Sequence, residues 1–92
     1  MTDMTKTSTA VRITVRYFAA ARAAAGTDTE AVTFAPDCTV ARMIDELSGR
    51  DAKLAAVLSR CSYLCDGVAV RDQNMALRSV QTVDVLPPFA GG

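Results

Sequence analysis

The strongest structural signal in this sequence is a pair of helical stripes that lie between two groups of strand-like segments. The first stripe has the three- and four-residue spacing of an amphipathic helix and consists of Val40, Met43, Ile44 and Leu47. The second, shorter stripe consists of Leu54, Val57, Leu58 and Cys61. Thr39 and Asp51 stand where their side-chain oxygens can cap the two helices, and Gly49 can end the first. We expect both stripes to cover one face of a sheet.

Two strand-like segments precede the helical stripes. Residues 11–17 alternate apolar and polar side chains, as a half-buried strand does, and residues 29–34 are rich in strand-forming types. Between them, residues 18–25 are alanine-rich and predict a helical turn that ends at Gly26. The two strands should therefore pair like a hairpin around this connection.

Three further strand-like segments follow the helices. Residues 63–65 and 68–70 predict two short strands joined by a tight turn. Residues 82–86 predict the last strand, which should end at Pro87-Pro88 because proline cannot donate to a strand ladder.

The connection over residues 71–80 is irregular, and we expect one helical turn there, around Met75 and Leu77. The resulting order, β-β-α-α-β-β-β, predicts an α+β fold with helices packed on one face of a five-stranded sheet. A chain of 92 residues supports one domain. We place this domain at residues 11–88, between a disordered N-terminal tail (1–10) and a flexible C-terminal tail (89–92).

The composition excludes several classes of function. Ten basic side chains balance ten acidic ones, so no net field favours nucleic acid or an anionic membrane. Histidine is absent, which removes Ser-His and Cys-His nucleophiles and most zinc sites, and we predict no metal site. The polar start of the chain is unlike a signal peptide, and no apolar run approaches the roughly 20 residues that span a bilayer. We therefore expect a cytoplasmic protein.

Cysteines and carboxylates offer no clear catalytic pattern. The three cysteines, an odd number without paired spacing, are Cys38, Cys61 and Cys65. We interpret them as packing residues with reduced thiols rather than as a disulfide framework. Asp45, Glu46 and Asp84 are not spaced to place two carboxyl groups across a bond, and we interpret them as solvated surface groups.

The C-terminal residues are the remaining candidate for chemistry, and they read Leu86-Pro87-Pro88-Phe89-Ala90-Gly91-Gly92. The prolines favour an extended backbone, so the chain should leave the domain pointing away from it. Four further residues then reach at most about 14 Å. Because glycine has no Cβ, a narrow channel in another protein can close around the main chain. Such a projecting terminus suits an α-carboxylate that must enter another protein's active site.

Several of these segments resemble the small subunit of molybdopterin synthase, the MoaD-type sulfur carriers of the ubiquitin-like β-grasp superfamily. The matching segments are Val15-Arg16-Tyr17-Phe18-Ala19-Ala20-Ala21-Arg22 with Gly26, the helix start Thr39-Val40, and the ending Pro87-Pro88-Phe89-Ala90-Gly91-Gly92. Thiamine-pathway carriers share the two glycines but generally not the double proline. The segment Ser79-Val80-Gln81-Thr82 departs from the Gly-Asp turn common in the family.

The resemblance implies a mixed β-grasp sheet and a function carried by Gly92. An E1-like enzyme would use ATP to adenylate the Gly92 carboxylate, and sulfur from a persulfide would displace AMP to leave a thiocarboxylate. The tail would then enter the large catalytic subunit, where its sulfur passes to cyclic pyranopterin monophosphate in molybdenum cofactor biosynthesis. The chain itself would bind no cofactor and would not be catalytic alone. Two small and two large subunits would form a heterotetramer.

Partner contacts are expected around the tail. The candidate residues are Gly91, Ala90, Phe89, Pro88, Pro87 and Leu86, with Phe18 and Arg22 taken from the resemblance. Three alternatives stay open: a ubiquitin-like modifier that forms isopeptide bonds, a sulfur carrier for thiamine or cysteine biosynthesis, and an interaction module without chemistry of its own.

Overall fold

The structure of the protein, a computed structural model, describes residues 10–88. The predicted N-terminal tail (1–10) lies outside the described residues apart from Ala10, and the predicted C-terminal tail (89–92) lies outside them entirely.

A mixed sheet of five strands and three helices make up the described part of the chain. In chain order they are β1 (Val11–Tyr17), α2 (Ala19–Ala25), β2 (Thr29–Phe34), α3 (Val40–Ser48), α4 (Ala52–Leu58), β3 (Ser62–Cys65), β4 (Val68–Ala69) and β5 (Thr82–Leu86). The strand order is β2-β1-β5-β3-β4. Strands β1 and β5 are parallel, and the other neighbouring pairs are antiparallel. The predicted α+β fold and the hairpin-like pairing of the first two strands are confirmed.

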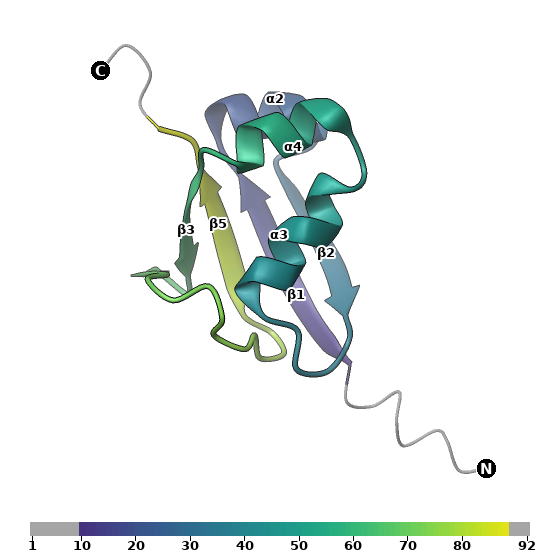
Figure 1. Cartoon of the computed structure of the whole chain (residues 1–92), viewed down its shortest axis with the longest axis vertical. Helices are drawn as coiled ribbons and strands as arrows, with labels where there is room; N and C mark the ends of the chain where they lie inside the picture. The colour runs from purple at the N-terminus through teal and green to yellow at the C-terminus, as the bar shows by residue number, and fades with distance from the viewer. Residues whose placement is uncertain (1–9, 89–92) are drawn as a thin grey trace, which may run out of the picture.

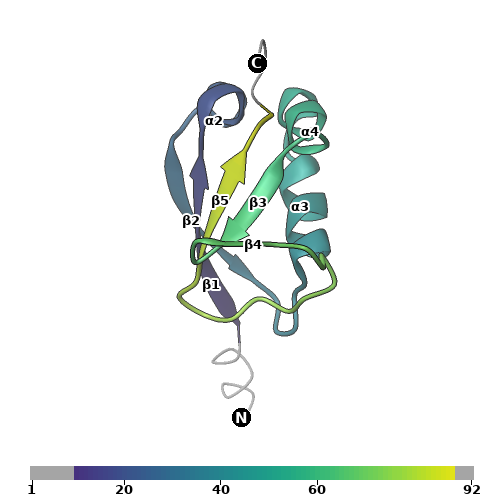
Figure 2. The same cartoon turned by 90° about the vertical axis from the view of Figure 1, so that its left-hand side faces the viewer.

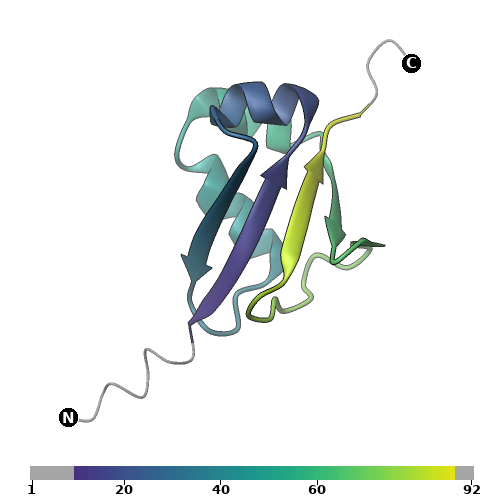
Figure 3. The same cartoon turned by 180° about the vertical axis from the view of Figure 1, so that it is seen from behind.

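Helices α3 and α4 cover one face of the sheet, as Figures 1 and 2 show. Helix α2 joins β1 to β2 at the end of the sheet where β1 and β5 finish, and it packs against α4. Seen from behind, none of the described helices lies across the strands (Figure 3). The core therefore lies on one face of the sheet, and the helices of residues 10–88 leave the opposite face open.

Alternation along β1 explains why the core forms on that face. Its odd-numbered residues are buried against the helices, and they are Val11, Ile13, Val15 and Tyr17. The helices contribute the buried residues Val40, Met43, Leu47, Leu54 and Leu58. Burying an aliphatic side chain of this size is worth roughly 1.5–3 kcal/mol. Both predicted stripes are thus confirmed, with Ile44, Val57 and Cys61 partly buried around this core.

Both predicted helix caps are present. The Thr39 hydroxyl accepts a hydrogen bond from the Arg42 amide at 3.1 Å, and the Asp51 carboxylate accepts one from the Leu54 amide at 3.1 Å. Helix α2 ends at Gly26 in the left-handed conformation, with φ at 80°. Local sequence signals therefore set where these helices begin and end.

The connection over residues 71–80 contains no helical turn, so that prediction is wrong. Instead, Ala76 pairs with Thr39 in an isolated antiparallel bridge. The carbonyl groups of Met75 and Gln73 accept hydrogen bonds from the first two amides of α3, at 3.1 and 2.8 Å. These amides have no partner within their own helix. The loop carbonyls satisfy these amides, and the loop forms tight turns over residues 73–74 and 79–80 rather than a helical turn.

The turn before β5 places Val80 at a φ of 71°, in the left-handed region that β-branched residues rarely adopt. Its amide donates a hydrogen bond to the Arg12 carbonyl at 2.8 Å, which ties the turn to β1. This is the segment in which the sequence departs from a glycine-containing turn.

Candidate functional site

The chain leaves the domain at the end of the sheet where β1 and β5 finish. The Phe18 amide donates to the Val85 carbonyl at 3.2 Å, so the two strands stay paired up to their ends. Strand β5 ends at Leu86, as predicted, and Pro87 is half-buried while Pro88 is exposed. The first strand begins and the last strand ends at opposite ends of the domain (Figure 1). The predicted site residues Phe89, Ala90, Gly91 and Gly92 lie outside the described residues.

An ion pair lies on the open face, next to this exit. Arg16 Nε is 2.6 Å from Asp84 Oδ1, and Arg16 Nη2 is 3.0 Å from Asp84 Oδ2, which is a bidentate geometry. The hydrogen bond and the charge of Asp84 raise the pKa of Arg16. The Arg16 guanidinium also lies over the ring of Phe18, 5.6 Å from its centroid.

The interpretation of Asp84 as a solvated surface group is therefore wrong. The residue is only 8% exposed, because β5 lies in the interior of the sheet between β1 and β3. Arg16 is its register partner on β1 and supplies the charge that a buried carboxylate needs. Asp45 and Glu46 are exposed, as predicted.

Phe18 and Arg22, the two partner residues predicted away from the C-terminal segment 86–92, lie together. They line one hollow of about 240 Å³ that Arg16, Ala19 and Asp28 also line. Phe18 is 38% exposed, and Arg22 is exposed. Helix α2 begins directly after β1, so it brings Arg22 back over the strand end. The result is an aromatic ring and two guanidinium groups at the end of the domain from which the tail departs.

A larger groove of about 500 Å³ lies on the α4 side of the exit. Its lining residues include Ala20, Ala56, Val57, Arg60, Pro87 and Pro88. Sequence reasoning missed this groove, apart from the two prolines. The only local signal is the run of alanines in α2 and α4, and the groove depends on how these helices pack together.

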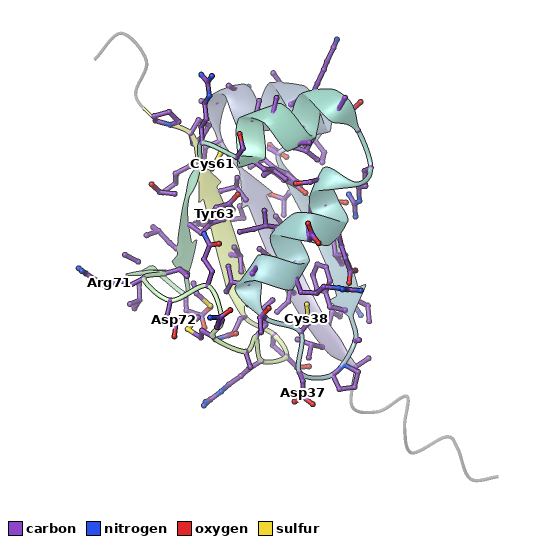
Figure 4. The ribbon with its side chains drawn as sticks, in the orientation of Figure 1. Asp37, Cys38, Cys61, Tyr63, Arg71 and Asp72 are labelled. Atoms are coloured by element: carbon purple, nitrogen blue, oxygen red, sulfur yellow. The ribbon has the colours of Figure 1, made fainter. Side chains whose placement is uncertain are left out.

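The cysteines fit the packing interpretation. Cys38 and Cys65 are buried, Cys61 is half-buried, and all three are free thiols. Burial raises the pKa of each thiol, which lowers the fraction of reactive thiolate at neutral pH. Figure 4 shows Cys38 and Cys61 at opposite ends of the helical layer. Cys61 and Cys65 are separated by the length of β3, too far for a disulfide.

Two tyrosine hydroxyls are also held inside the domain. Tyr17 donates to Glu30 at 2.6 Å, and Arg50 pairs with the same carboxylate at 2.8 Å. Tyr63, labelled in Figure 4, donates to the Leu58 carbonyl at 2.8 Å. The pKa of both tyrosines is raised, and the largest cause is the loss of solvent around their buried hydroxyl groups. The Tyr63 contact joins β3 to α4, and the Tyr17–Glu30–Arg50 contacts join β1 and β2 to the connection between α3 and α4.

Within residues 10–88, no group of three or more histidine, cysteine or acidic side chains is placed to hold a metal ion. The same part of the chain has no helix that is long and apolar enough to cross a membrane.

The strand order, the parallel β1–β5 pair in the interior and the two helices on one face define a ubiquitin-like β-grasp domain whose last strand leads straight into the C-terminal tail. Residues 15–92 match the ThiS family, and the chain belongs to this family of ubiquitin-like sulfur carriers. The match includes the tail residues that the structure does not describe.

Solved structures agree with this assignment. The chain is similar to the HVO 2177 protein of Haloferax volcanii, with 26% identity, a TM-score of 0.80, and coverage of 91% of this chain and 89% of that one. It is similar to a protein assigned as molybdopterin converting factor subunit 1 from Pyrococcus furiosus, with 26% identity, a TM-score of 0.78, and coverage of 85% and 98%. It is also similar to SAMP1 from Haloferax volcanii, with 25% identity, a TM-score of 0.76, and coverage of 88% and 99%. The search of curated protein sequences found no match.

Proposed function

We propose that this protein is the small, sulfur-carrying subunit of molybdopterin synthase. The observation that carries the proposal is the course of β5. This strand runs parallel to β1 and ends beside the end of β1, and the sequence continues from it through Pro87-Pro88 to Gly91-Gly92. The family match spans this ending. The reacting group would be the Gly92 carboxyl, which makes the chain a sulfur donor within an enzyme complex rather than a catalyst alone.

The chemistry begins with activation, because a free α-carboxylate is ionised at neutral pH and is a poor electrophile. The Gly92 carboxylate attacks the α-phosphate of ATP on an E1-like enzyme and releases pyrophosphate. A persulfide sulfur then attacks the acyl carbon and displaces AMP, and a thiol cleaves the resulting S–S bond to leave the thiocarboxylate. In the large subunit, the thiocarboxylate sulfur bonds to cyclic pyranopterin monophosphate, and water then cleaves the acyl–sulfur bond, which regenerates the Gly92 carboxylate and leaves the sulfur on the substrate. ATP is used by the activating enzyme, and this chain holds no cofactor of its own.

The similar structures support this choice of pathway and partner. The Pyrococcus furiosus protein is assigned to molybdopterin conversion. A chain of the same fold from Helicobacter pylori occurs in a complex of subunits 1 and 2 of molybdopterin-converting factor, and that chain shares 16% identity with the present one at a TM-score of 0.66. In our proposal, the tail enters the active site of the large subunit. Leu86, Pro87 and the hollow lined by Phe18 and Arg22 contact the surface of the large subunit around that entrance. A cytoplasmic location is part of the proposal, since three free thiols stay reduced there.

The test is intact-mass measurement after incubation with ATP, a sulfur source and the cognate activating enzyme. The C-terminal peptide should gain the mass difference of one sulfur replacing one oxygen. A chain that lacks Gly92, or one with a tag after Gly92, should show no gain, whereas a tag before Met1 should leave the gain intact. An unmodified C-terminal peptide from the untagged protein contradicts the proposal.

The similarity to SAMP1 favours one second candidate, a ubiquitin-like protein modifier, because solved structures of this fold include small archaeal modifier protein 1 from Haloferax volcanii and from Methanosarcina acetivorans. A modifier would appear in the same experiment as conjugates of higher mass joined to lysines of other proteins. A carrier for thiamine or cysteine biosynthesis would gain sulfur but transfer it to a different acceptor. Pull-down with the large subunit of molybdopterin synthase and with the alternative acceptor enzyme separates these two.

A further inference from the structure

The groove beside the tail exit has walls that suit an apolar side chain. Ala20 from α2, Ala56 and Val57 from α4, and Pro87-Pro88 line it, together with Ser59 and Arg60. The Ser59 hydroxyl already donates to the Ala56 carbonyl at 2.7 Å. We propose that residues 89–92 of the same chain fold back into this groove in the free protein, with the Phe89 ring against the alanine and valine side chains.

The position of Pro88 makes the tail the nearest occupant. Pro88 is itself part of the groove wall, so Phe89 is attached to the site by one peptide bond. One residue spans at most about 3.6 Å, and the ring therefore starts at the mouth of the groove. A tether this short gives an effective concentration on the order of millimolar or higher, which a free partner segment would have to match.

Small side chains explain why the groove can take an aromatic ring. Helices α2 and α4 pack against each other, and at this edge Ala20 and Ala56 each contribute only a methyl group. A volume of about 500 Å³ accommodates one phenylalanine side chain with room for the backbone that follows. An aromatic ring covers roughly 150–250 Å² when buried, and this apolar contact favours the docked tail.

Charge complements the apolar fit. Arg60 is exposed and takes part in none of the ion pairs among residues 10–88, and none of the acidic residues in that range lines the groove. The Gly92 carboxylate is three residues beyond Phe89 and can reach up to about 11 Å from it. A docked Phe89 therefore leaves the terminal negative charge within range of the Arg60 guanidinium.

This inference goes beyond the proposed function and does not depend on it. A docked tail keeps the terminal carboxyl on the domain until a partner competes for the segment. The apparent affinity of any such partner is then reduced by the fraction of molecules in which the tail is docked.

The test uses the full chain alone, without ATP or activating enzyme. In an isotope-labelled sample, NOEs should join the Phe89 ring protons to the methyl groups of Ala20, Ala56 and Val57. Phe89→Ala and a chain that ends at Pro88 should give the same changed methyl shifts. Ala56→Leu should fill the groove and remove the Phe89 NOEs, whereas Ala52→Leu, an exposed change on the same helix outside the groove, should keep them.

A further measurement tests the charge. Carboxypeptidase should release residues 90–92 several-fold faster from Ala56→Leu and from Arg60→Ala than from Ala52→Leu. The absence of NOEs in the unaltered chain, with identical methyl shifts in the chain ending at Pro88, overturns the inference. Methyl shifts that respond only when a large subunit is added also overturn it, because the groove would then be a partner site. Neither result bears on thiocarboxylate formation, which the mass experiment measures separately.

Discussion

Arg16 on β1 and Asp84 on β5 face each other in the parallel strand pair and form a bidentate ion pair, with contacts of 2.6 and 3.0 Å, on the face that the described helices leave open. The two residues are 68 positions apart in the sequence. Their contact joins the first strand to the last one, from which the tail departs. It therefore fixes the position of the last strand's end relative to the hollow lined by Phe18 and Arg22.

Asp84→Asn should lower the free energy of unfolding by about 1 kcal/mol, because it removes the charge from a largely buried carboxylate while Arg16 stays partly solvated. Urea denaturation measures this change. Glu46→Gln is the matched control, since it breaks an exposed pair with Arg42 at 3.0 Å and should leave the free energy of unfolding nearly unchanged. If both variants lose the same free energy of unfolding, the burial of Asp84 adds nothing to the stability that its ion pair provides.

Phe18→Ala should weaken binding to the large subunit roughly five- to tenfold, because exposed aromatic side chains next to guanidinium groups are frequent binding hot spots. Titration calorimetry with the purified large subunit gives the affinity. Val68→Ala removes another exposed apolar side chain, which is 69% exposed and lies on the edge strand β4, and it should leave the affinity unchanged. A similar loss in both variants would place the contact elsewhere.

Val80→Gly should stabilise the protein by roughly 0.5–1 kcal/mol. The left-handed backbone costs a residue with a Cβ about 1–2 kcal/mol, and the extra freedom of glycine in the unfolded chain offsets part of the gain. Gly26→Ala, at a φ of 80°, should act in the opposite direction. Thermal and urea unfolding of the two variants provide the comparison. A Val80→Gly chain that is less stable than the unaltered protein would contradict the presence of backbone strain at this turn.

Stability should fall at alkaline pH. Burial raises the pKa of Cys38, Cys61 and Cys65 and of Tyr17 and Tyr63 above their ordinary values, so the folded state keeps these protons to higher pH than the unfolded chain does. Their contribution is complete below the unfolded pKa and is lost as pH rises through the folded pKa. Each group adds a slope of at most about 1.4 kcal/mol per pH unit.

Urea denaturation between pH 7 and pH 10.5 measures this profile. We expect a flat region up to about pH 8.5 and a decline above it, since the unfolded cysteines titrate first. Cys65→Ala should reduce the slope in its lower part, and Tyr63→Phe should reduce the slope above the ordinary tyrosine pKa. A profile without any decline would mean that the folded environment of these groups does not favour their neutral forms.

Much of the fold could be predicted because its signals are local. The alternation over residues 11–17, the stripe that begins at Val40 and the caps at Thr39 and Asp51 each depend on residues a few positions apart. The prolines ended β5 where expected, because a missing amide acts at its own position. Strand and helix positions followed from these patterns with little help from tertiary contacts.

The predictions that failed concern partners far apart in the chain. Asp84 looks like an ordinary polar residue until β5 is placed between β1 and β3, and the loop around Met75 looks helical until the amides at the start of α3 need acceptors. Phe18 and Arg22 are predicted as partner contacts from the family resemblance, but the hollow they share required α2 to return over the end of β1.

The sequence by itself therefore determined the elements, their caps and the Gly-Gly ending, because spacing and backbone chemistry act within a few residues. Only the tertiary structure decided which carboxylate is buried, where the exposed amides of a helix find partners, and that a groove lies between α2, α4 and the exit prolines. Burial and hydrogen bonding depend on which segments meet in space, and that is a property of the packed chain as a whole.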